Sequence, residues 1–251
     1  MEINANGNPK DIDKEDNQKE EEEKYKYSVE IIGEQYKEYD FSYKLIVIGN
    51  SGVGKSCLSL KSTKGIFEED FISTIGFEFF SFFLKINNQV IKLQIWDTCG
   101  QEVYRSLISN FYRNSSVAIL VYAINDRQSY EDIDVWNKQL KTNASPDCKV
   151  FLIGNKADLE DERKITYEEG KKCQQNNKFD MFMETSAKTG LNAQKVFIDA
   201  AKMIYEENLK YMSQEEQEAI KGNEQKVYKS ITKNIELNKI GEDANNNEGC
   251  C

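Results

Sequence analysis

The sequence predicts an α/β fold: a mostly parallel six-stranded sheet with one antiparallel edge strand and helices on both faces. Three observations support it. Between residues 43 and 211, short apolar segments alternate with segments of helical periodicity, which is typical of a parallel sheet covered on both faces. A glycine-rich loop directly follows the first apolar segment. Asn87-Asn88 separates the second and third apolar segments and predicts a hairpin turn, which makes one strand antiparallel.

The strands are expected at the short apolar runs, and the helices between them. The predicted strands are residues 44–48, 77–86, 90–96, 117–123, 150–153 and 179–183. The predicted helices are residues 56–63, a short one after Gln101, 129–141, 166–176 and 193–211. In an open sheet of this kind ligands bind beyond the carboxyl ends of the strands. Every chemical motif described below falls at such an end.

Charge divides the chain into three parts. Residues 1–42 hold thirteen acidic residues and six lysines, and residues 212–248 hold eight acidic residues and five lysines. These two segments together account for the whole formal net charge of −10. Polar, highly charged segments cannot bury enough apolar surface to offset their ordering entropy. We therefore expect a disordered acidic extension at 1–42, a folded domain at 43–211 and a flexible tail at 212–251. A solvated extension is a simpler interpretation than an acidic docking arm.

Composition excludes several functions. The chain has no histidine, which removes Ser-His and Cys-His catalysis and a histidine-containing zinc site. Its excess of acid argues against nucleic acid as a partner. The longest apolar run, residues 117–124, is too short to span a bilayer, and no hydrophobic signal region begins the chain, so we expect the folded part in the cytosol.

Residues 49–56, GNSGVGKS, have the spacing of a phosphate-binding loop. Gly52 and Gly54 lack a Cβ, so the chain can turn tightly and direct backbone N–H groups at an anion. The helix that follows adds unpaired N–H groups and the positive end of its dipole. Lys55 offers a mobile charge for the β- and γ-phosphates, and the Ser56 hydroxyl suits Mg²⁺. A glycine-rich turn that matches by chance is the alternative, and the preceding strand disfavours it.

A second motif, WDTCGQE at residues 96–102, closes the third predicted strand. Asp97 at the strand tip can hold Mg²⁺, usually through a water, opposite the phosphate loop. Alone, such an aspartate is more often a turn former or a helix cap. Gly100 offers a backbone N–H to a γ-phosphate, and Gln101 can both accept from and donate to an attacking water.

Two more motifs, NKAD at residues 155–158 and ETSAK at residues 184–188, each follow a predicted strand. Asp158 can accept two hydrogen bonds from the ring N–H and the exocyclic amine of guanine, whereas adenine would leave it unpaired. The backbone N–H of Ala187 can reach the guanine oxygen. Either motif alone is weak, but both in this order predict a guanine nucleotide site.

With these motifs, residues 43–211 resemble the Rab branch of the Ras-like small GTPases. The resemblance rests on GNSGVGKSC at the loop, ISTIG at residues 72–76, WDTCGQE, NKAD and ETSAK. It implies a P-loop NTPase G domain, GTP and GDP as ligands with Mg²⁺, and hydrolysis of GTP with Gln101 as the catalytic residue. It also implies that Ser56, Thr74 and Asp97 hold the metal, and that Phe79, Trp96 and Phe111 form the effector surface, although these rings could equally be core aromatics. The nucleotide-binding residues implied are Ser51, Gly52, Val53, Gly54, Lys55, Ser56, Cys57, Phe67, Thr74, Gly100, Asn155, Lys156, Asp158, Ser186, Ala187 and Lys188.

Four positions depart from the family pattern. Cys99 stands where the family usually has alanine, beside the glycine that moves when the γ-phosphate leaves, so a larger side chain there can slow switching or hydrolysis. Asn50 replaces the usual aspartate, Val103 a basic residue and Asn114 a common glycine. None of these removes a group expected to contact phosphate.

The chain ends in Gly249-Cys250-Cys251. The resemblance implies that Cys250 and Cys251 are both geranylgeranylated; the alternative is an accidental pair. The nearby sequence is acidic rather than polybasic, so stable anchoring should require both lipid chains.

The predicted function is a Rab-like GDP/GTP switch that hydrolyses GTP slowly and recruits effectors to membranes in vesicle trafficking. The implied partners are a guanine nucleotide exchange factor, a GTPase-activating protein, a GDP-dissociation inhibitor and Rab effectors, acting on a monomer that cycles between the cytoplasm and endomembranes. A GTP-bound scaffold that hardly hydrolyses, with Cys99 as the reason, is the chief alternative. An adenine-specific P-loop kinase is disfavoured because no lid segment or adenine-selective element is evident.

Overall fold

The structure is a computed structural model that describes residues 27–33, 38–69, 74, 76–100 and 111–212. Of the predicted functional residues, Gln101, Cys250 and Cys251 lie outside this range, as does the predicted short helix after Gln101. The chain divides into two compact units. Among the described residues, the larger unit comprises residues 32–33, 38–69, 74, 76–84, 90–100 and 111–212, and the smaller unit comprises residues 27–31 and 85–89.

The larger unit is built on a sheet with the strand order β3-β4-β2-β5-β6-β7. Strand β2 pairs in parallel with both β4 and β5, and β5-β6 and β6-β7 are also parallel pairs. Only the two-residue turn Asn87-Asn88 joins β3 to β4, so these strands run in opposite directions, as predicted. The strand bounds are β2 Phe41–Ile48, β3 Phe77–Ile86, β4 Gln89–Thr98, β5 Val117–Ala123, β6 Lys149–Asn155 and β7 Met181–Glu184.

The described residues include one strand that the sequence analysis missed. Strand β1, Val29–Ile32, stands next to β3 in the strand order, so the sheet of the described residues has seven strands rather than six, and β3 is not its edge. Beside β1, the backbone N–H of Asn87 donates to the backbone carbonyl oxygen of Ser28 at 2.8 Å, and the backbone N–H of Ser28 donates to Asn87 Oδ1 at 3.1 Å. Backbone pairing of this kind leaves little trace in side-chain pattern. The predicted disordered extension therefore contains β1 and the first residues of β2.

The helices follow the predicted order with one correction. The single helix predicted at 129–141 is two, because Asp126 caps a first short helix by accepting from the Gln128 N–H at 3.1 Å, and Asp132 then separates it from the second. Helix α6 begins with a capping box in which Thr166 and Glu169 bond each other's backbone N–H groups. The bounds are α2 Lys55–Lys64, α4 Arg127–Glu131, α5 Ile133–Asn143, the 3₁₀ helix η2 Glu160–Glu162, α6 Tyr167–Asn177 and α7 Ala193–Tyr211.

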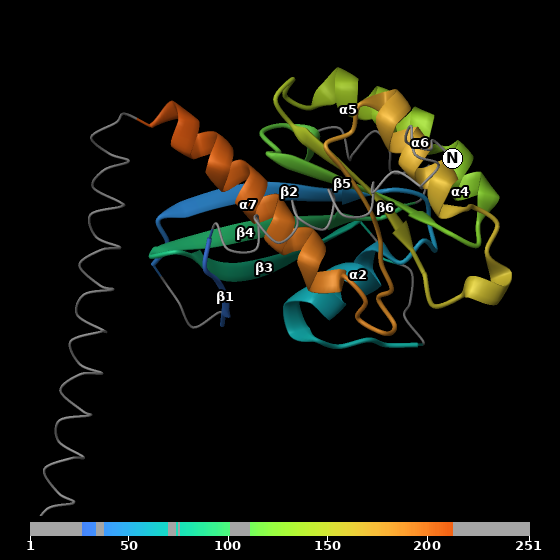
Figure 1. The fold of residues 1–251 in the computed structure, drawn as a ribbon, viewed down its shortest axis with the longest axis horizontal. Coiled ribbons are helices and arrows are strands. Elements are labelled where there is room, and N and C mark those ends of the chain that lie inside the picture. Colours follow the sequence, from blue (N-terminus) through green and yellow to red (C-terminus); the bar gives the residue numbers. More distant parts are fainter. Residues whose placement is uncertain (1–26, 34–37, 70–73, 75, 101–110, 213–251) are drawn as a thin grey trace, which may run out of the picture. The chain divides into compact units, whose positions relative to one another are not determined.

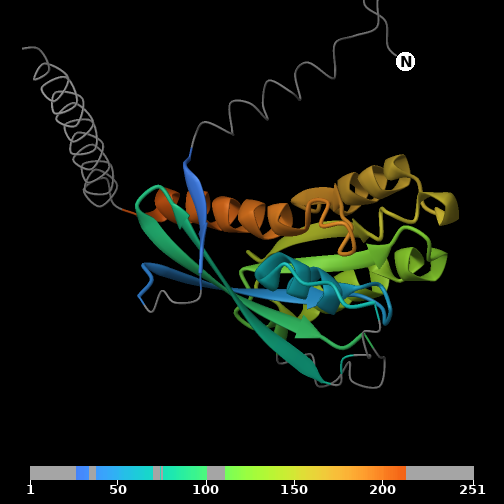
Figure 2. The same cartoon turned by 90° about the horizontal axis from the view of Figure 1, so that it is seen from below.

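Both faces of the sheet are covered. Every residue of β5 is buried, as expected for a central parallel strand. On one face, Ile46 and Ile48 of β2 share a core cluster with Trp136 and Leu140 of α5. The alternate residues of β2 point to the other face, where α2 and α7 pack against each other. Figures 1 and 2 show α7 running along the sheet, while α4, α5 and α6 gather beside β5, β6 and β7.

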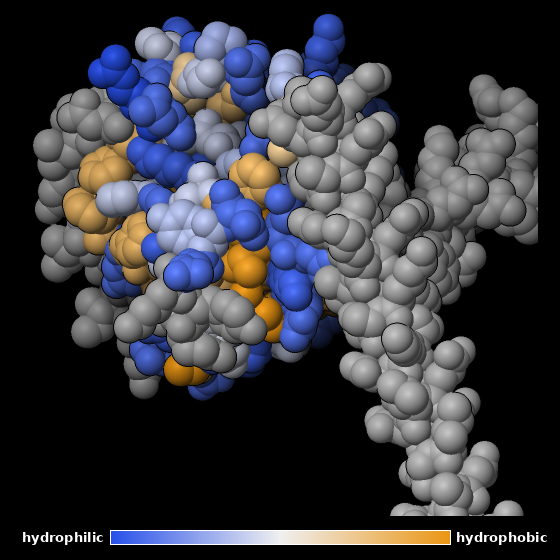
Figure 3. All heavy atoms as spheres, turned by 90° about the vertical axis from the view of Figure 1, so that its left-hand side faces the viewer, coloured by the Kyte–Doolittle hydropathy of each residue, from blue (hydrophilic) through white to orange (hydrophobic). Residues whose placement is uncertain are grey.

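The surface is mixed in character. Figure 3 shows hydrophobic residues reaching one face in separate patches among hydrophilic ones. Within the described residues, no helix combines the length and the hydropathy needed to cross a bilayer.

Candidate functional site

A cavity of about 530 Å³ lies where the loops after β2, β4, β6 and β7 meet. This is the carboxyl edge of the sheet, at which the sequence analysis placed its motifs. The residues that line the cavity are Ser51, Gly52, Gly54, Lys55, Ser56, Cys57, Phe67, Glu68, Glu69, Thr74, Thr98, Gly100, Asn155, Lys156, Asp158, Leu159, Ala187 and Lys188.

Two of the predicted nucleotide-binding residues, Val53 and Ser186, support this wall from behind instead of lining it. Both are buried. The Val53 oxygen accepts a hydrogen bond from Asn155 Nδ2 at 2.9 Å, and Ser186 Oγ donates to Asp158 Oδ1 at 2.6 Å. Their role is therefore to orient the residues that the cavity exposes.

The sequence analysis missed four lining residues: Glu68, Glu69, Thr98 and Leu159. Each lies within two residues of a predicted site residue, and Thr98 also belongs to the WDTCGQE motif, so position in the sequence was the available signal. The Glu69 carboxylate lies 3.2 Å from Lys188 Nζ, so an exposed ion pair joins two loops of the lining. The Thr98 hydroxyl donates to the Val47 oxygen at 2.8 Å and is thereby held on the sheet.

The glycine-rich loop has the geometry of an anion site. Gly54 caps α2 in the left-handed region, with φ 91°, and no side chain caps the first N–H groups of the helix. A Cβ at Gly54 would lie only 2.5 Å from Asn155 Nδ2, so glycine is required here for space as well as for conformation. Lys55 Nζ donates to the Gly49 oxygen at 3.0 Å and to the Asn50 oxygen at 2.8 Å, which places the ammonium group inside the curve of the loop.

Three oxygen-bearing side chains meet beside this loop. The Ser56 and Thr74 hydroxyl oxygens are 2.6 Å apart, and Ser56 Oγ also donates to Asp97 Oδ2. Asp97 is fully buried, and its Oδ1 has no hydrogen-bond partner among the described residues. An unpaired buried carboxylate oxygen next to two hydroxyls is a donor set of the kind that Mg²⁺ prefers.

Burial shifts both charged groups of this site toward neutrality. It lowers the pKa of Lys55 to about 8, although the charge of Asp97 opposes the shift. It raises the pKa of Asp97 to about 7, against the hydrogen bond from Ser56 and the charge of Lys55. The opposite charges of a phosphate and a metal ion would restore the ionised form of each group.

Gly100 packs directly on the phosphate loop. A Cβ there would lie 2.3 Å from the Ser51 nitrogen and 2.5 Å from the Asn50 oxygen, so any side chain at this position would push the two segments apart. The preceding residue, Cys99, donates its N–H to the Gly76 oxygen at 3.0 Å. The end of β4 is thus held against both the phosphate loop and the start of β3.

Asn155 joins the loops that are predicted to read the base. Its Oδ1 accepts from Thr185 Oγ1 at 3.0 Å and from the Ala187 N–H at 3.3 Å, while its amide nitrogen donates to Val53. One buried side chain therefore connects three loops that lie far apart in sequence.

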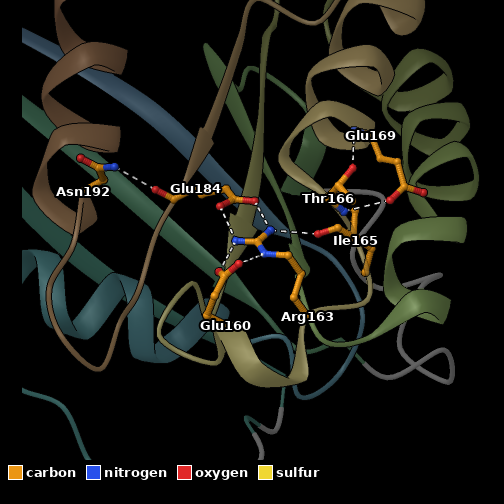
Figure 4. A network of polar contacts seen from close by, with 7 residues as sticks. All are labelled: Glu160, Arg163, Ile165, Thr166, Glu169, Glu184 and Asn192. Atoms are coloured by element: carbon orange, nitrogen blue, oxygen red, sulfur yellow. Dashed lines mark hydrogen bonds and ion pairs between the residues drawn. The ribbon is translucent and has the colours of Figure 1, made fainter.

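Arg163 fixes the same loops from the outside (Figure 4). Its guanidinium group makes two bidentate pairs at 2.7–2.8 Å, one with Glu184 at the start of ETSAK and one with Glu160, two residues after Asp158. It also donates to the Ile165 oxygen at 2.9 Å. A planar fork of this kind specifies geometry as well as contributing binding energy.

The predicted effector aromatics form a partly exposed cluster. The Phe79 side chain is 46% exposed, whereas Trp96 and Phe111 are half-buried. The Trp96 ring lies 5.2 Å from that of Phe79 and 5.3 Å from that of Phe111. Phe77, which the sequence analysis left out, contacts both Trp96 and Phe111 and is also exposed.

Comparison with known proteins decides the family. The Ras family profile matches residues 44–206, which span the sheet from β2 to α7. The chain belongs to the Ras family. Among its relatives, this small GTPase is 43% identical to the Ras-related protein Rab-4B of Homo sapiens over 166 residues, which are 66% of this chain and 78% of that protein. It is 37% identical to the GTP-binding protein YPT1 of Saccharomyces cerevisiae over 218 residues, 85% and 98% of the two chains.

Two departures from the family pattern have a structural explanation in this small GTPase. Asn114 adopts a left-handed conformation with φ 60°, which asparagine tolerates better than most residues, so it can stand where glycine is common. Cys99 is 2% exposed and belongs to the hydrophobic core cluster rather than to the lining of the cavity.

Replacement of Arg163 should reduce the discrimination between bases. Arg163→Lys keeps the charge but loses both bidentate pairs, so Asp158 should lose its alignment with the exocyclic amine of guanine. We predict that the preference for GDP over inosine diphosphate, which lacks that amine, falls about threefold to tenfold. Competition binding to the full chain measures this ratio.

Arg127→Ala is the matched control, because Arg127 pairs with Glu169 at 2.8 Å outside the cavity. It should leave the ratio unchanged. If Arg163→Lys weakens both nucleotides equally, Arg163 supports the fold without positioning Asp158.

Proposed function

We propose that this protein is a Rab-like switch that binds GDP and GTP with Mg²⁺, hydrolyses GTP slowly and recruits effectors to membranes in vesicle trafficking. The observation that carries the proposal is the single cavity in which the phosphate loop, Gly100, Asp158 and Ala187 converge. Lys55 lies in the phosphate loop at one end of the cavity, and the Asp158 carboxylate lines the other end. The relatives named Rab-4B and YPT1 support the placement within the Rab branch.

The phosphates would lie along the loop and the start of α2. There the backbone N–H groups and Lys55 would bind the β- and γ-phosphate oxygens. Ser56, Thr74 and Asp97 fit a magnesium ion, because the buried Asp97 Oδ1 has no partner among the described residues. The bound ion would neutralise phosphate charge.

The base and the γ-phosphate would be read at opposite ends of the cavity. Asp158, held by Ser186, would accept from guanine, and Ala187 would donate to the guanine oxygen. Thr74 and Gly100 would contact the γ-phosphate, and loss of that phosphate would release the segments that carry them. Gln101 would orient the attacking water.

A partner should supply what this site lacks. Among the described residues, no arginine lines the cavity. In Ras, an arginine donated in trans raises the hydrolysis rate by about 10³- to 10⁵-fold. We therefore propose that a GTPase-activating protein acts on this chain, alongside an exchange factor, a GDP-dissociation inhibitor and effectors that bind the exposed aromatic cluster.

Nucleotide binding is the first test. The purified full chain with Mg²⁺ should prefer GDP over ADP by at least about 100-fold, because adenine leaves the Asp158 carboxylate unpaired. Asp158→Ala should remove most of this preference in competition binding. Asp161→Ala, which changes an exposed carboxylate on η2, should retain it. A wild-type chain without a guanine preference would contradict the proposal.

Hydrolysis separates the switch from the scaffold. Because the Cys99 side chain packs in the core and not in the cavity, Cys99→Ala should leave the single-turnover rate within about threefold of wild type. Gln101→Leu should slow it at least about tenfold, because the water loses its orienting group. Slow wild-type hydrolysis that recovers only in Cys99→Ala would favour the GTP-bound scaffold.

Membrane retention tests the tail. We propose that Cys250 and Cys251 both carry geranylgeranyl groups, and one lipid chain gives only marginal binding. Changing either residue to serine should shift most of the protein from the membrane to the soluble fraction in cell fractionation. Cys173→Ser, in α6, is the control and should stay on membranes. Unchanged partitioning of both single variants would contradict dual lipidation.

A further inference from the structure

Asn50 links the phosphate loop to a distant helix. Its Nδ2 donates to Asp132 Oδ2 at 2.6 Å, and its Oδ1 accepts from Trp136 Nε1 at 2.8 Å. Asp132 directly precedes α5, and Trp136 lies in its first turns. The side chain at the position where the family usually has aspartate therefore has two specific partners, more than eighty residues away in sequence.

The chemistry of these partners selects an amide. The Trp136 indole can only donate and the Asp132 carboxylate accepts, so the residue between them must offer one acceptor and one donor. Asparagine does this with its oxygen toward Trp136 and its nitrogen toward Asp132. An aspartate at position 50 could still accept from Trp136, but it would set two carboxylates in hydrogen-bond contact.

Helix α5 is a firm support for the loop. Trp136 is 1% exposed, and Ile133 and Leu140 lie in the same core cluster. The second oxygen of Asp132 is also engaged, because Gln128 Nε2 donates to its Oδ1 at 2.9 Å. Asp132 thus cannot turn away from a poor neighbour without losing another hydrogen bond.

The backbone of Asn50 contacts two of the groups proposed to bind the γ-phosphate, Lys55 and Gly100. Its carbonyl oxygen accepts from Lys55 Nζ at 2.8 Å. A Cβ at Gly100 would lie 2.4 Å from the Asn50 carbonyl carbon, so the two backbones are already in contact. A shift of Asn50 would therefore move both Lys55 and Gly100.

We propose that Asn50 is a positioning residue that, through Asp132 and Trp136, holds the phosphate loop where Lys55 and Gly100 can bind the γ-phosphate. This inference rests on the proposed function and deepens it. The asparagine at position 50 and the aspartate at position 132 form a matched pair: a carboxylate at position 50 requires an amide at position 132.

The test is an exchange of the two groups. Asn50→Asp should speed the release of GDP, and should speed the release of a non-hydrolysable GTP analogue more, by about tenfold or greater for the analogue. Adding Asp132→Asn should restore both rates. The amide introduced at 132 can donate to the carboxylate at 50, and its oxygen can still accept from Gln128.

Asn50→Asp with Asp134→Asn is the matched control. Asp134 is an exposed acid in the first turn of α5, so this pair has the same net charge without the new hydrogen bond, and it should not be rescued. Thermal melting of each variant reports folding. Asn50→Ala, which adds no repulsion, gives a second measure and should show a smaller change in the same direction.

Three outcomes overturn the inference: wild-type release from Asn50→Asp, equal rescue by Asp134→Asn, or equal acceleration for the two nucleotides, which would indicate a purely structural role. These results require that the wild type binds GDP. If it does not, the proposed function fails, and this inference fails with it.

Discussion

The buried amide of Asn155 is the interaction on which the rest of the site depends. It is 1% exposed and bonds the glycine-rich loop through Val53 and the loop after β7 through Thr185 and Ala187. A buried amide with unmatched partners costs a large desolvation penalty, so its hydrogen bonds allow one arrangement of the three loops. Parallel strand pairing brings those loops to one edge, and Asn155 then sets their spacing.

Two charged groups of the site are held in an electrostatically unfavourable, buried environment. Lys55 and Asp97 are almost completely buried, and burial moves the pKa of each toward its neutral form. Unfavourable burial of charged groups is typical of functional sites, where a bound ligand of opposite charge can offset it. Arg163 shows the contrasting solution, because two glutamates satisfy its fork completely and it needs no ligand. Lys55 and Asp97 thus differ from Arg163, whose charge is already neutralised by two carboxylates of the protein.

Sequence was a good guide to the site because its residues follow strands in short, chemically explicit motifs. It was a poor guide wherever the partner is distant. In the sequence, Asn50 is only a departure from the family pattern. The fold shows that its side chain donates a hydrogen bond to Asp132. Arg163 belongs to no sequence motif, because its contribution is a hydrogen-bonded ion pair with Glu184, which is distant in sequence. Strand β1 was missed because its four residues lie in an acidic segment and pair through backbone groups. The break between α4 and α5 at Asp132 was missed because a single capping residue hardly changes the helical periodicity of the apolar residues around it.

The rim and the floor of the cavity are held by different forces. The floor depends on hydrogen bonds around Asn155 and Thr185, whose side chains are buried. The Glu69–Lys188 pair at the rim is more than half exposed on both sides, and contacts of that kind contribute little and weaken further as ions accumulate around them. Loss of this rim contact therefore costs little free energy and leaves the buried hydrogen bonds of Asn155 unchanged, so the two sides of the cavity differ in how firmly the fold holds them.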